Sequence, residues 1–353
     1  MTPTPLNGPY RFPAEWEAHE ATWIAWPHHE PDWPGKLAPI PWTYAEIVRV
    51  LHAHERVEIL CHDETVQASA EQVLTAHGVN GNYRLHLVPN DRVWVRDSGP
   101  TAVIAVDGTV ALVNWEFTAW AKYPNFARDA AVGSAVARIT HRPLLEPRRP
   151  DTGARVVLEG GAIDSDGSGT LLVTEECLLS AIQNRNPGLS RAQYEDVFRD
   201  ALGIHRTIWL GEGCVGDDTH GHVDDVARFV APGVVALAFE ADPADDDNHR
   251  RSVDNYARLQ SAGGADGTLR VVKLPYPRAV TMNGERLPAS YANFYIANGA
   301  VIVPTFNDRN DRIALNTLAE LFPDRMVVGI HCVDLVWGFG TLHCLTQQQP
   351  SGG

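Results

Sequence analysis

The sequence predicts an α/β fold built from repeated units, because four similar hairpins alternate with helix-like stretches along the chain. Each hairpin consists of two short β-branched runs joined at a glycine-containing turn, a pattern typical of strands. The turn glycines are separated by 61, 64 and 66 residues, and a repeat of this length is typical of stacked or radially arranged units. The hairpins span 101–113, 162–174, 226–239 and 293–306, with turn glycines Gly108, Gly169, Gly233 and Gly299.

The turns and the stretches between them support this prediction. Asp107–Gly108 and Asn298–Gly299 are dipeptides that tight primed turns prefer, because both central residues need a positive φ. The intervening stretches carry apolar residues at i, i+3 and i+4, which predicts helices, and Ser190 and Gly203 are suitable cap residues for one of them. The predicted helices cover 44–57, 64–78, 190–203, 245–263 and 311–324.

A single catalytic domain over residues 1–353 accounts for this organisation. The chain has neither a long linker nor a low-complexity tract that would divide it. About five units of hairpin, helix and strand fit its length, and the fifth unit would join the ends of the chain, pairing 21–27 with 340–346.

The charge of the chain excludes several classes of function. Lys and Arg number 29 against 44 Asp and Glu, a formal net charge of −15. Nucleic acids and anionic lipids require a basic face, so neither is an expected partner. A small cationic ligand would suit the chain if some of the acids meet at one site.

The cellular compartment is predicted from two further observations. The N-terminal segment lacks the basic and apolar regions of a secretory signal, and no apolar run approaches the ~20 residues of a membrane helix. Five scattered cysteines without CxxC spacing favour reduced thiols and a cytoplasmic location. They are Cys61, Cys177, Cys214, Cys332 and Cys344.

Two polar clusters accompany the first two hairpins. In NDRVWVRDSGP (90–100), Trp94, Arg96 and Asp97 lie where we expect a strand to feed a Gly-Pro turn. In LEGGAID (158–164), Glu159 precedes two glycines, which allow another group to approach the backbone closely. Taken alone, either acid could simply belong to a turn.

The third cluster, GDDTHGHVDDVARFV (216–230), is the densest. If this segment is a strand, alternation places His220, His222 and Asp224 on one face. Two interpretations compete. The three side chains could bind zinc, iron or manganese, or a His/Asp pair could transfer protons and hold a cationic substrate.

The fourth cluster, WGFGTLHCLTQQQP (337–350), contains the best candidate nucleophile. Cys344 is expected at the end of a glycine-rich strand, beside a histidine and three glutamines rather than among aliphatic residues. Such surroundings favour a reactive thiol over an inert buried one.

If the units stand around an axis, the four clusters meet at the centre. The site would then combine the Cys344 thiol, the His222 imidazole, the Trp94 indole and three carboxylates, with Arg96 as the one obvious inward cation. Carboxylates raise the pKa of a neighbouring thiol, so the substrate itself must bring positive charge. A guanidinium does so, and its N–H groups fit two carboxylates in a bidentate manner.

Several long strings resemble the agmatine deiminase family, which also contains the bacterial peptidylarginine deiminase type. They occur in order between about residues 10 and 350: AEWEAHEATWIAWP, WVRDSGP, LEGGAI, LLVTEECLL, GHVDD, NFYIANGAVIVP and LHCLTQQQP. The resemblance implies the pentein fold, a five-bladed α/β propeller. It also implies catalysis without a metal or organic cofactor.

The resemblance further implies a role for each site residue. Cys344 would attack the guanidinium carbon, and His222 would protonate the departing ammonia and then activate water. Asp97 and Asp224 would hold guanidinium N–H groups. Glu159 would orient His222 or bind substrate, and Trp94 would form a wall of the pocket with a cation–π contact.

The substrate is less narrowly specified than the chemistry. The chain departs from the usual agmatine-type pattern at Thr118, at His220 and across Gly338–Leu342, where the family commonly has Asn, Asn and Gly-Gly-Gly-Asn-Ile. Agmatine is the first expectation. The alternative substrates are free arginine, another guanidino compound and a C-terminal peptidyl arginine. The alternative functions are amidino transfer, metal-dependent hydrolysis and a non-catalytic binding propeller. A homo-oligomeric assembly is also possible for any of these.

Overall fold

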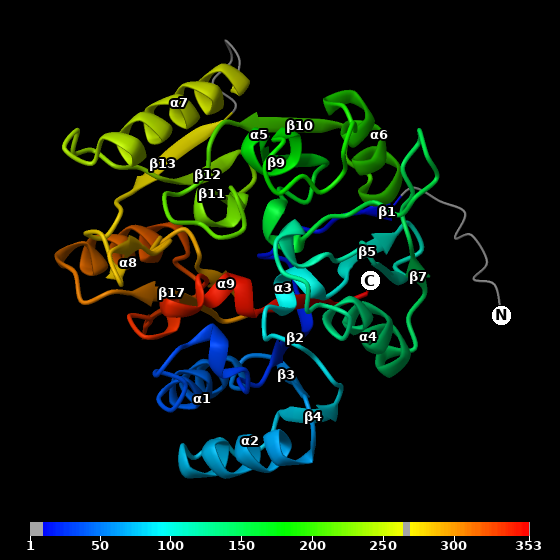
Figure 1. Cartoon of the computed structure of the whole chain (residues 1–353), viewed down its shortest axis with the longest axis vertical. Coiled ribbons are helices and arrows are strands. Elements are labelled where there is room, and N and C mark those ends of the chain that lie inside the picture. The colour runs from blue at the N-terminus through cyan, green and yellow to red at the C-terminus, as the bar shows by residue number, and fades with distance from the viewer. Residues whose placement is uncertain (1–9, 264–268, 353) are drawn as a thin grey trace.

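Five sheets of one common plan and a separate two-stranded hairpin account for the strands that the structure describes. It is a computed structural model that describes residues 10–263 and 269–352. In each of the five sheets, an antiparallel pair of strands is extended by a parallel strand. Figure 1 shows these sheets and their helices around a middle that holds the short helices α3 (Val95–Ser98) and α9 (Leu342–Leu345).

Most sheets consist of strands that are consecutive along the chain, except that β1 joins β5–β7 and β19 joins β2–β4. The sheets have the orders β1-β5-β6-β7, β10-β9-β8, β11-β12-β13, β16-β17-β18 and β19-β2-β3-β4, and β14 pairs with β15. The strands are β1 (Tyr10–Arg11), β2 (His19–Ala25), β3 (Arg56–Cys61), β4 (Tyr83–Leu87), β5 (Thr101–Ala105), β6 (Val110–Val113), β7 (Leu144–Leu145), β8 (Asp164–Ser165), β9 (Thr170–Thr174), β10 (Arg206–Leu210), β11 (Ala227–Ala231), β12 (Val234–Ala238), β13 (Arg270–Leu274), β14 (Thr281–Met282), β15 (Glu285–Arg286), β16 (Tyr295–Ile296), β17 (Ala300–Thr305), β18 (Met326–His331) and β19 (Gln347–Pro350).

The longer helices link the parallel strands and lie on the outside of the molecule (Figure 1). Within the part of the chain that the structure describes, no helix is long and apolar enough to span a membrane. The helices besides α3 and α9 are α1 (Ile40–Leu51), α2 (Glu64–Ala76), α4 (Val132–Thr140), α5 (Glu175–Leu179), α6 (Arg191–Leu202), α7 (Asp246–Ala262) and α8 (Arg309–Leu321), and the 3-10 turns are η1 (Glu30–Asp32), η2 (Ala119–Ala121), η3 (Asp129–Ala131), η4 (Gly160–Ala162), η5 (Val223–Asp225) and η6 (Leu335–Gly338).

All four predicted hairpins are confirmed. They are the antiparallel pairs β5/β6, β8/β9, β11/β12 and β16/β17. Gly108 and Gly233 have φ angles of 83° and 68°, which a residue with a Cβ rarely adopts. Local turn geometry therefore contributes to these two pairs, whereas the Asn298–Gly299 turn has no positive φ and is held by hydrogen bonds to the distant His19 and Glu55.

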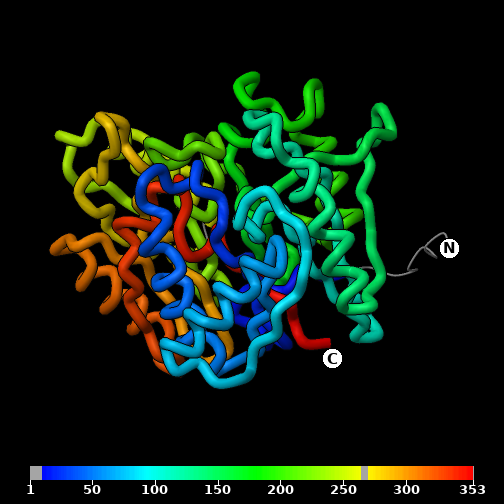
Figure 2. The backbone as a smooth tube through the Cα atoms, turned by 60° about the horizontal axis from the view of Figure 1, so that its bottom comes forward, coloured from blue at the N-terminus to red at the C-terminus, as the bar shows by residue number. Residues whose placement is uncertain are grey.

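The predicted closure of the chain is confirmed, but its register was wrong. β19 pairs with β2, with Gln347 opposite Trp23. The segment 340–346, expected to pair with 21–27, instead contains α9. Figure 2 shows the red C-terminal segment running between blue N-terminal segments, so the sequence neighbours of Cys344 close the last sheet.

The predicted helices are present, with boundary errors at two of them: α8 covers Arg309–Leu321 instead of 311–324, and α1 begins at Ile40 instead of residue 44. The stretch 44–57 was expected to be helical throughout, but α1 ends at Leu51 and β3 begins at Arg56. The apolar residues at the end of α1 and at the start of β3 together resemble one continuous helical pattern. The predicted caps of α6 are confirmed, because Ser190 and Gln193 form a capping box and Gly203 adopts a left-handed conformation.

Candidate active site

A cavity of about 390 Å³ opens beside the middle of the molecule. Cys344 and Asp97 both line it, and they come from α9 and α3, which contact each other. The remaining lining residues include several aromatic side chains, among them Trp94, Trp120 and Trp337. An apolar wall with a few convergent polar groups is typical of a small-molecule site.

The sequence predicted Cys344 at the end of a strand, but it lies in the short helix α9. Its Sγ atom is 3.1 Å from Asn293 Nδ2, which donates to it, and 3.7 Å from Asp224 Oδ2. Burial raises the pKa of the Cys344 thiol well above its usual value, and the carboxylates of Asp224, Asp225 and Asp97 raise it further. The resting thiol is therefore protonated at neutral pH.

Asp97 lies in α3 and not in the turn predicted at this point. One carboxylate oxygen accepts a hydrogen bond from Trp120 Nε1 at 2.9 Å, and the other accepts one from the Gly161 backbone N–H at 3.0 Å. Burial raises the pKa of Asp97 to about 6, with contributions from Asp224 and Glu159, although His222 opposes this shift.

His222 lies between two carboxylates behind the floor of the cavity. Its Nδ1 is 3.7 Å from Asp97 Oδ1, and its Nε2 is 3.5 Å from Glu159 Oε2. Burial alone lowers the pKa of His222, but Asp97, Cys177 and Glu159 together raise it well above the usual value. The imidazole thus carries both protons at neutral pH and can act as an acid.

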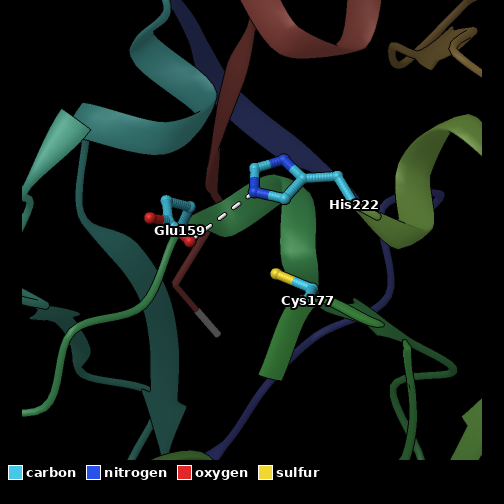
Figure 3. Close-up of side chains that lie close together, drawn as sticks. All are labelled: Glu159, Cys177 and His222. Atoms are coloured by element: carbon cyan, nitrogen blue, oxygen red, sulfur yellow. Dashed lines mark ion pairs between the residues drawn. The ribbon is translucent and has the colours of Figure 1, made fainter. Parts of the chain in front are cut away.

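Glu159 precedes η4 and is fully buried. Burial raises its pKa, but Arg185, whose Nε donates to Glu159 Oε1 at 3.1 Å, and His222 lower it to about 2. Figure 3 shows the Glu159 carboxylate facing the imidazole of His222, with the thiol of Cys177 nearby. Glu159 is therefore a carboxylate at every pH at which the protein is expected to work.

Gly161 shows how closely the site residues converge. A Cβ atom on this residue would lie 2.5 Å from His222 Nδ1, 2.9 Å from Asp97 Oδ1 and 3.1 Å from Asp224 Oδ2. Three functional atoms thus surround one point, which a larger side chain would fill. The glycine in LEGGAI is needed because the backbone passes through the site.

Asp224 is fully buried and belongs to η5, not to a strand. Burial raises its pKa, but the hydrogen bond and the charge of His343 outweigh this effect and lower it. Among the described residues, its Oδ1 atom has no hydrogen-bond partner. A free oxygen of this kind can accept an N–H from a bound ligand.

His220 does not join the site, so the expected shared face of His220, His222 and Asp224 was wrong. His220 and Gly221 have φ angles of 64° and 94°, and this turn removes the strand alternation. The side chain of His220 instead lies 3.0 Å from Ser180 Oγ and 3.8 Å from Glu176. The proposed metal-ligand set is therefore not assembled.

Two other groups of side chains have the spacing of metal ligands. In each, three ligand atoms lie within 4.8 Å of one another. The groups are Glu159, Cys177 and His222, and Asp224, Asp225 and Cys344. Each group includes one carboxylate of the candidate site, Glu159 in the first and Asp224 in the second.

Trp94 lines the cavity as expected, with its ring centroid 5.7 Å from that of Trp33. Cβ atoms on Gly338 and Gly340 would approach the Trp94 ring to 2.9 and 2.7 Å, so the glycines of GFGT leave space for the indole. Phe339, a departure from the family pattern, also lines the cavity.

Sequence reasoning missed most of the buried cations. Arg185 and Arg228 were not singled out, yet both are buried and paired with carboxylates. Arg96 points behind the cavity, where it contacts Glu15 and Gln348. No local pattern marks these arginines, because their partners lie up to 252 residues away along the chain.

Comparisons with known proteins agree with this geometry. Residues 11–350 match the family model described as Porphyromonas-type peptidyl-arginine deiminase. The agmatine deiminases of Stutzerimonas stutzeri and Pseudomonas aeruginosa are 39% and 38% identical to the chain, and each alignment covers 99% of it and 98% of the relative.

A solved structure agrees as well. The agmatine deiminase of Enterococcus faecalis superposes with a TM-score of 0.87 at 32% identity, over 97% of this chain and 96% of that one. Matches of this extent cover every cluster from Trp94 to Cys344. The family resemblance is confirmed, and the chain belongs to the Porphyromonas-type peptidyl-arginine deiminase family.

Proposed function

We propose that this protein hydrolyses agmatine to N-carbamoylputrescine and ammonia, with Cys344 as a covalent nucleophile. The observation that carries the proposal is a connected set of side chains behind one cavity: Cys344 and Asp97 line it, His222 lies between Asp97 and Glu159, and Asp224 lies 3.7 Å from the Cys344 thiol. The relatives named agmatine deiminases, which align over nearly the whole chain, support the same reaction.

Substrate binding comes first. The guanidinium enters between Asp97 and Asp224, whose unpartnered oxygen accepts one of its N–H groups. Its charge offsets the carboxylates that disfavour a thiolate, so Cys344 loses its proton to solvent as the substrate binds. Trp94 covers the cation with its ring face.

The chemical steps then need one nucleophile and one acid. The Cys344 thiolate forms an S–C bond to the guanidinium carbon and gives a tetrahedral adduct. His222 passes a proton to one amino group, the C–N bond breaks, and ammonia leaves. The product of this half-reaction is a cationic amidino-cysteine, and His222 is left neutral.

Water completes the reaction. The neutral His222 takes a proton from the water that attacks the amidino carbon. The C–S bond then breaks, the ureido product forms, and the proton released from it restores the Cys344 thiol. Glu159 holds the imidazole for both proton transfers, and Arg185 keeps Glu159 charged.

The cavity wall favours agmatine over arginine. Arg92 is the one Arg or Lys among the described lining residues, and its guanidinium already bonds Asn125 and lies 3.5 Å from Asp32. A substrate carboxylate would thus meet the acids Asp32 and Asp218 without a free cation. An amine-ended substrate fits these charges better.

The wider arrangement is part of the same proposal. Residues 1–353 form one catalytic domain, and the five sheets correspond to the five blades of a pentein propeller whose axis passes through the site. Five reduced, buried cysteines suit a cytoplasmic enzyme. A homo-oligomer is also proposed, because closed symmetric assemblies are common among enzymes of this size.

Replacement of the nucleophile tests the mechanism. Cys344→Ala is expected to abolish ammonia release from agmatine, because no other thiol lines the cavity among the described residues. Cys332→Ala is a matched control, since Cys332 is also buried but lies outside the cavity lining. Full activity of Cys344→Ala would contradict the proposal.

The substrate preference is tested separately. Agmatine, arginine, small guanidino acids and peptides ending in arginine are compared for ammonia release by the intact protein. We expect the highest kcat/KM with agmatine. A higher kcat/KM with arginine would contradict the charge argument for the cavity wall and leave the Cys344 mechanism intact.

A further inference from the structure

We infer that His343 is a positioning residue that holds the Asp224 carboxylate in place by donating a hydrogen bond from each of its two ring nitrogens, one to Asp224 and one to Glu15. This inference rests on the proposed function, in which Asp224 receives the guanidinium. His343 precedes the nucleophile in α9, so one short helix would carry both Cys344 and the group that orients its substrate.

The contacts of the imidazole are the first observation. His343 Nδ1 lies 2.7 Å from Asp224 Oδ2, and Nε2 lies 2.8 Å from Glu15 Oε2. The three side chains are at most 4% exposed, so water does not share these contacts. Ionised carboxylates only accept hydrogen bonds, and therefore both ring nitrogens must carry a proton.

The charge balance of the surrounding network is the second observation. Glu15 also pairs with Arg96 at 3.2 Å and Arg228 at 2.8 Å, and Arg228 pairs with Asp164 at 3.0 Å. Both Asp164 oxygens accept hydrogen bonds, from Arg228 and from the Phe229 backbone, as expected of a carboxylate.

The charges of these six groups balance when His343 is an imidazolium, and the neighbouring Asp225 adds none, because burial and Asp224 raise the pKa of Asp225 well above its usual value. The carboxylates of Glu15, Asp164 and Asp224 then balance the cations of Arg96, Arg228 and His343. A neutral imidazole would leave one buried negative charge without a partner, which is costly in a site that excludes water. Geometry and charge balance thus point to the same protonation state.

The arrangement explains why Asp224 has one free oxygen. Its Oδ2 is engaged by His343, whereas its buried Oδ1 has no hydrogen-bond partner among the described residues. Asn293 links the backbone of α9 to the thiol. Its side-chain oxygen accepts a hydrogen bond from the His343 backbone N–H at 3.0 Å, and its side-chain nitrogen donates one to Cys344 Sγ. The carboxylate and the thiol are thereby held relative to each other.

Nitrogen NMR of histidine-labelled protein tests the protonation state directly. We expect both ring nitrogens of His343 to resonate as protonated nitrogens at neutral pH, with the signals assigned by their loss in His343→Gln. One unprotonated ring nitrogen would overturn the inference. This measurement needs no turnover, so it does not depend on the proposed function.

Kinetics test the positioning role. His343→Gln removes the positive charge and carries both of its N–H donors on one nitrogen instead of at two separate ring positions, and we expect kcat/KM to fall on the order of 10- to 100-fold. His19→Gln is the matched control, because His19 is buried and lies between Glu55 and the Glu15 carbonyl but does not touch Asp224. Equal kcat/KM for the two variants, at similar loss of Tm, would mean a merely structural role and overturn the inference.

A charge-restoring double variant separates charge from packing. His343→Gln leaves the network with one excess negative charge, and Glu15→Gln removes it. We expect the double variant to have a higher kcat/KM than His343→Gln alone, and an equal or lower value would contradict the charge argument. Failure of the wild-type protein to release ammonia from any guanidino compound would instead refute the proposed function and leave the NMR result standing.

Discussion

The two carboxylates beside His222 differ in what accompanies them. Glu159, on one side of the imidazole, is paired with Arg185, and its pKa is lowered to about 2. Asp97, on the other side, has only neutral hydrogen-bond donors besides His222, and its pKa is raised to about 6. Both side chains are buried to a similar degree, so the difference in pKa comes from the neighbouring charges: Arg185 lowers the pKa of Glu159, whereas Asp224 and Glu159 raise that of Asp97.

This difference separates a structural carboxylate from a binding one. A buried acid with its own arginine is already satisfied and can hold a neighbour in place. Asp97 has no arginine and shares the His222 cation with Glu159, so a cationic ligand gains more beside Asp97 because binding relieves an existing electrostatic penalty. Under the proposed function, the Glu159 side would support His222, whereas the Asp97 side would bind the guanidinium.

The largest effect is expected from neutralising the binding side. Asp97→Asn removes a guanidinium acceptor, and we expect kcat/KM for agmatine to fall by about 10³-fold, as for other groups that act on transition-state charge. The free energy of unfolding should change little, because relief from burying the Asp97 carboxylate is offset by the loss of its attraction to the protonated His222. Steady-state kinetics and denaturant unfolding measure the two quantities.

A variant of Asp97 that loses stability but keeps its activity would contradict the distinction between Asp97 and Glu159. Asp97→Asn protein that keeps kcat/KM within a few fold but unfolds more easily would assign Asp97 a structural role. Asp129→Asn is a suitable control, because burial also raises the pKa of Asp129, to about 7, while its oxygen serves the backbone N–H groups of Asp91 and Arg92.

A smaller effect, mainly on stability, is expected on the other side. Arg185→Gln leaves the buried Glu159 without its cation, and the free energy of unfolding should fall by about 3 kcal/mol. Activity should fall less than in Asp97→Asn, since Arg185 reaches the reaction only through Glu159 and His222. Urea unfolding and kcat/KM, measured on the same preparation, check both statements.

Restoration of charge balance is the control for this variant. The double variant Arg185→Gln and Glu159→Gln removes both charges and should unfold at a higher urea concentration than Arg185→Gln alone. If the single variant is as stable as the wild type, the arginine does not account for the lowered pKa of Glu159.

The smallest effect is expected from pH. The carboxyl of Asp97 is ionised above its pKa of about 6 and protonated below it, so kcat/KM should fall as pH drops through about 6, by about tenfold per unit. Glu159, with a pKa of about 2, stays ionised in this range and should not contribute. A profile of kcat/KM between pH 4.5 and 8, which are about the limits a working protein tolerates, is the measurement.

Replacement of Asp97 sharpens this assignment. In Asp97→Asn the fall in kcat/KM near pH 6 should disappear from the residual activity. Its persistence would mean that another group titrates there.

Much of the fold was accessible to sequence reasoning because its signals are local. The hairpin at Asp107–Gly108 and the Ser190 cap each depend on a few neighbouring residues, and the structure confirms both. The expected primed turn was wrong, because only Gly108 of the two central residues has a positive φ. The end of the first long helix was misplaced, because the apolar pattern continues from α1 into β3 without a breaker.

The candidate site was predictable to a similar extent and failed for a different reason. Unusual polar strings marked Asp97, Glu159, His222, Asp224 and Cys344. In the structure Asp97 and Cys344 line the cavity, and the other three lie behind it, linked to them by contacts of 3.5 to 3.7 Å. His220 was misplaced because a left-handed turn at His220–Gly221 overrides alternation. Arg185 pairs with Glu159, 26 residues earlier, and His343 contacts Asp224 and Glu15, 119 and 328 residues away. Single-sequence patterns carry no signal for such contacts.

The pairing of β19 with β2 has a consequence for how the molecule folds. Trp23 Nε1 donates to Gln349 Oε1, 326 residues along the chain, whereas each hairpin closes over a short turn. Contacts between such distant segments form slowly, because ordering a long loop costs entropy before it is rewarded. The sheets built from local hairpins would therefore form early. Cys344, three residues before β19, would reach the carboxylates of Asp97, Glu159 and Asp224 only when β19 pairs with β2 in the final step of folding. Recovery of activity during refolding should accordingly lag behind the recovery of secondary structure.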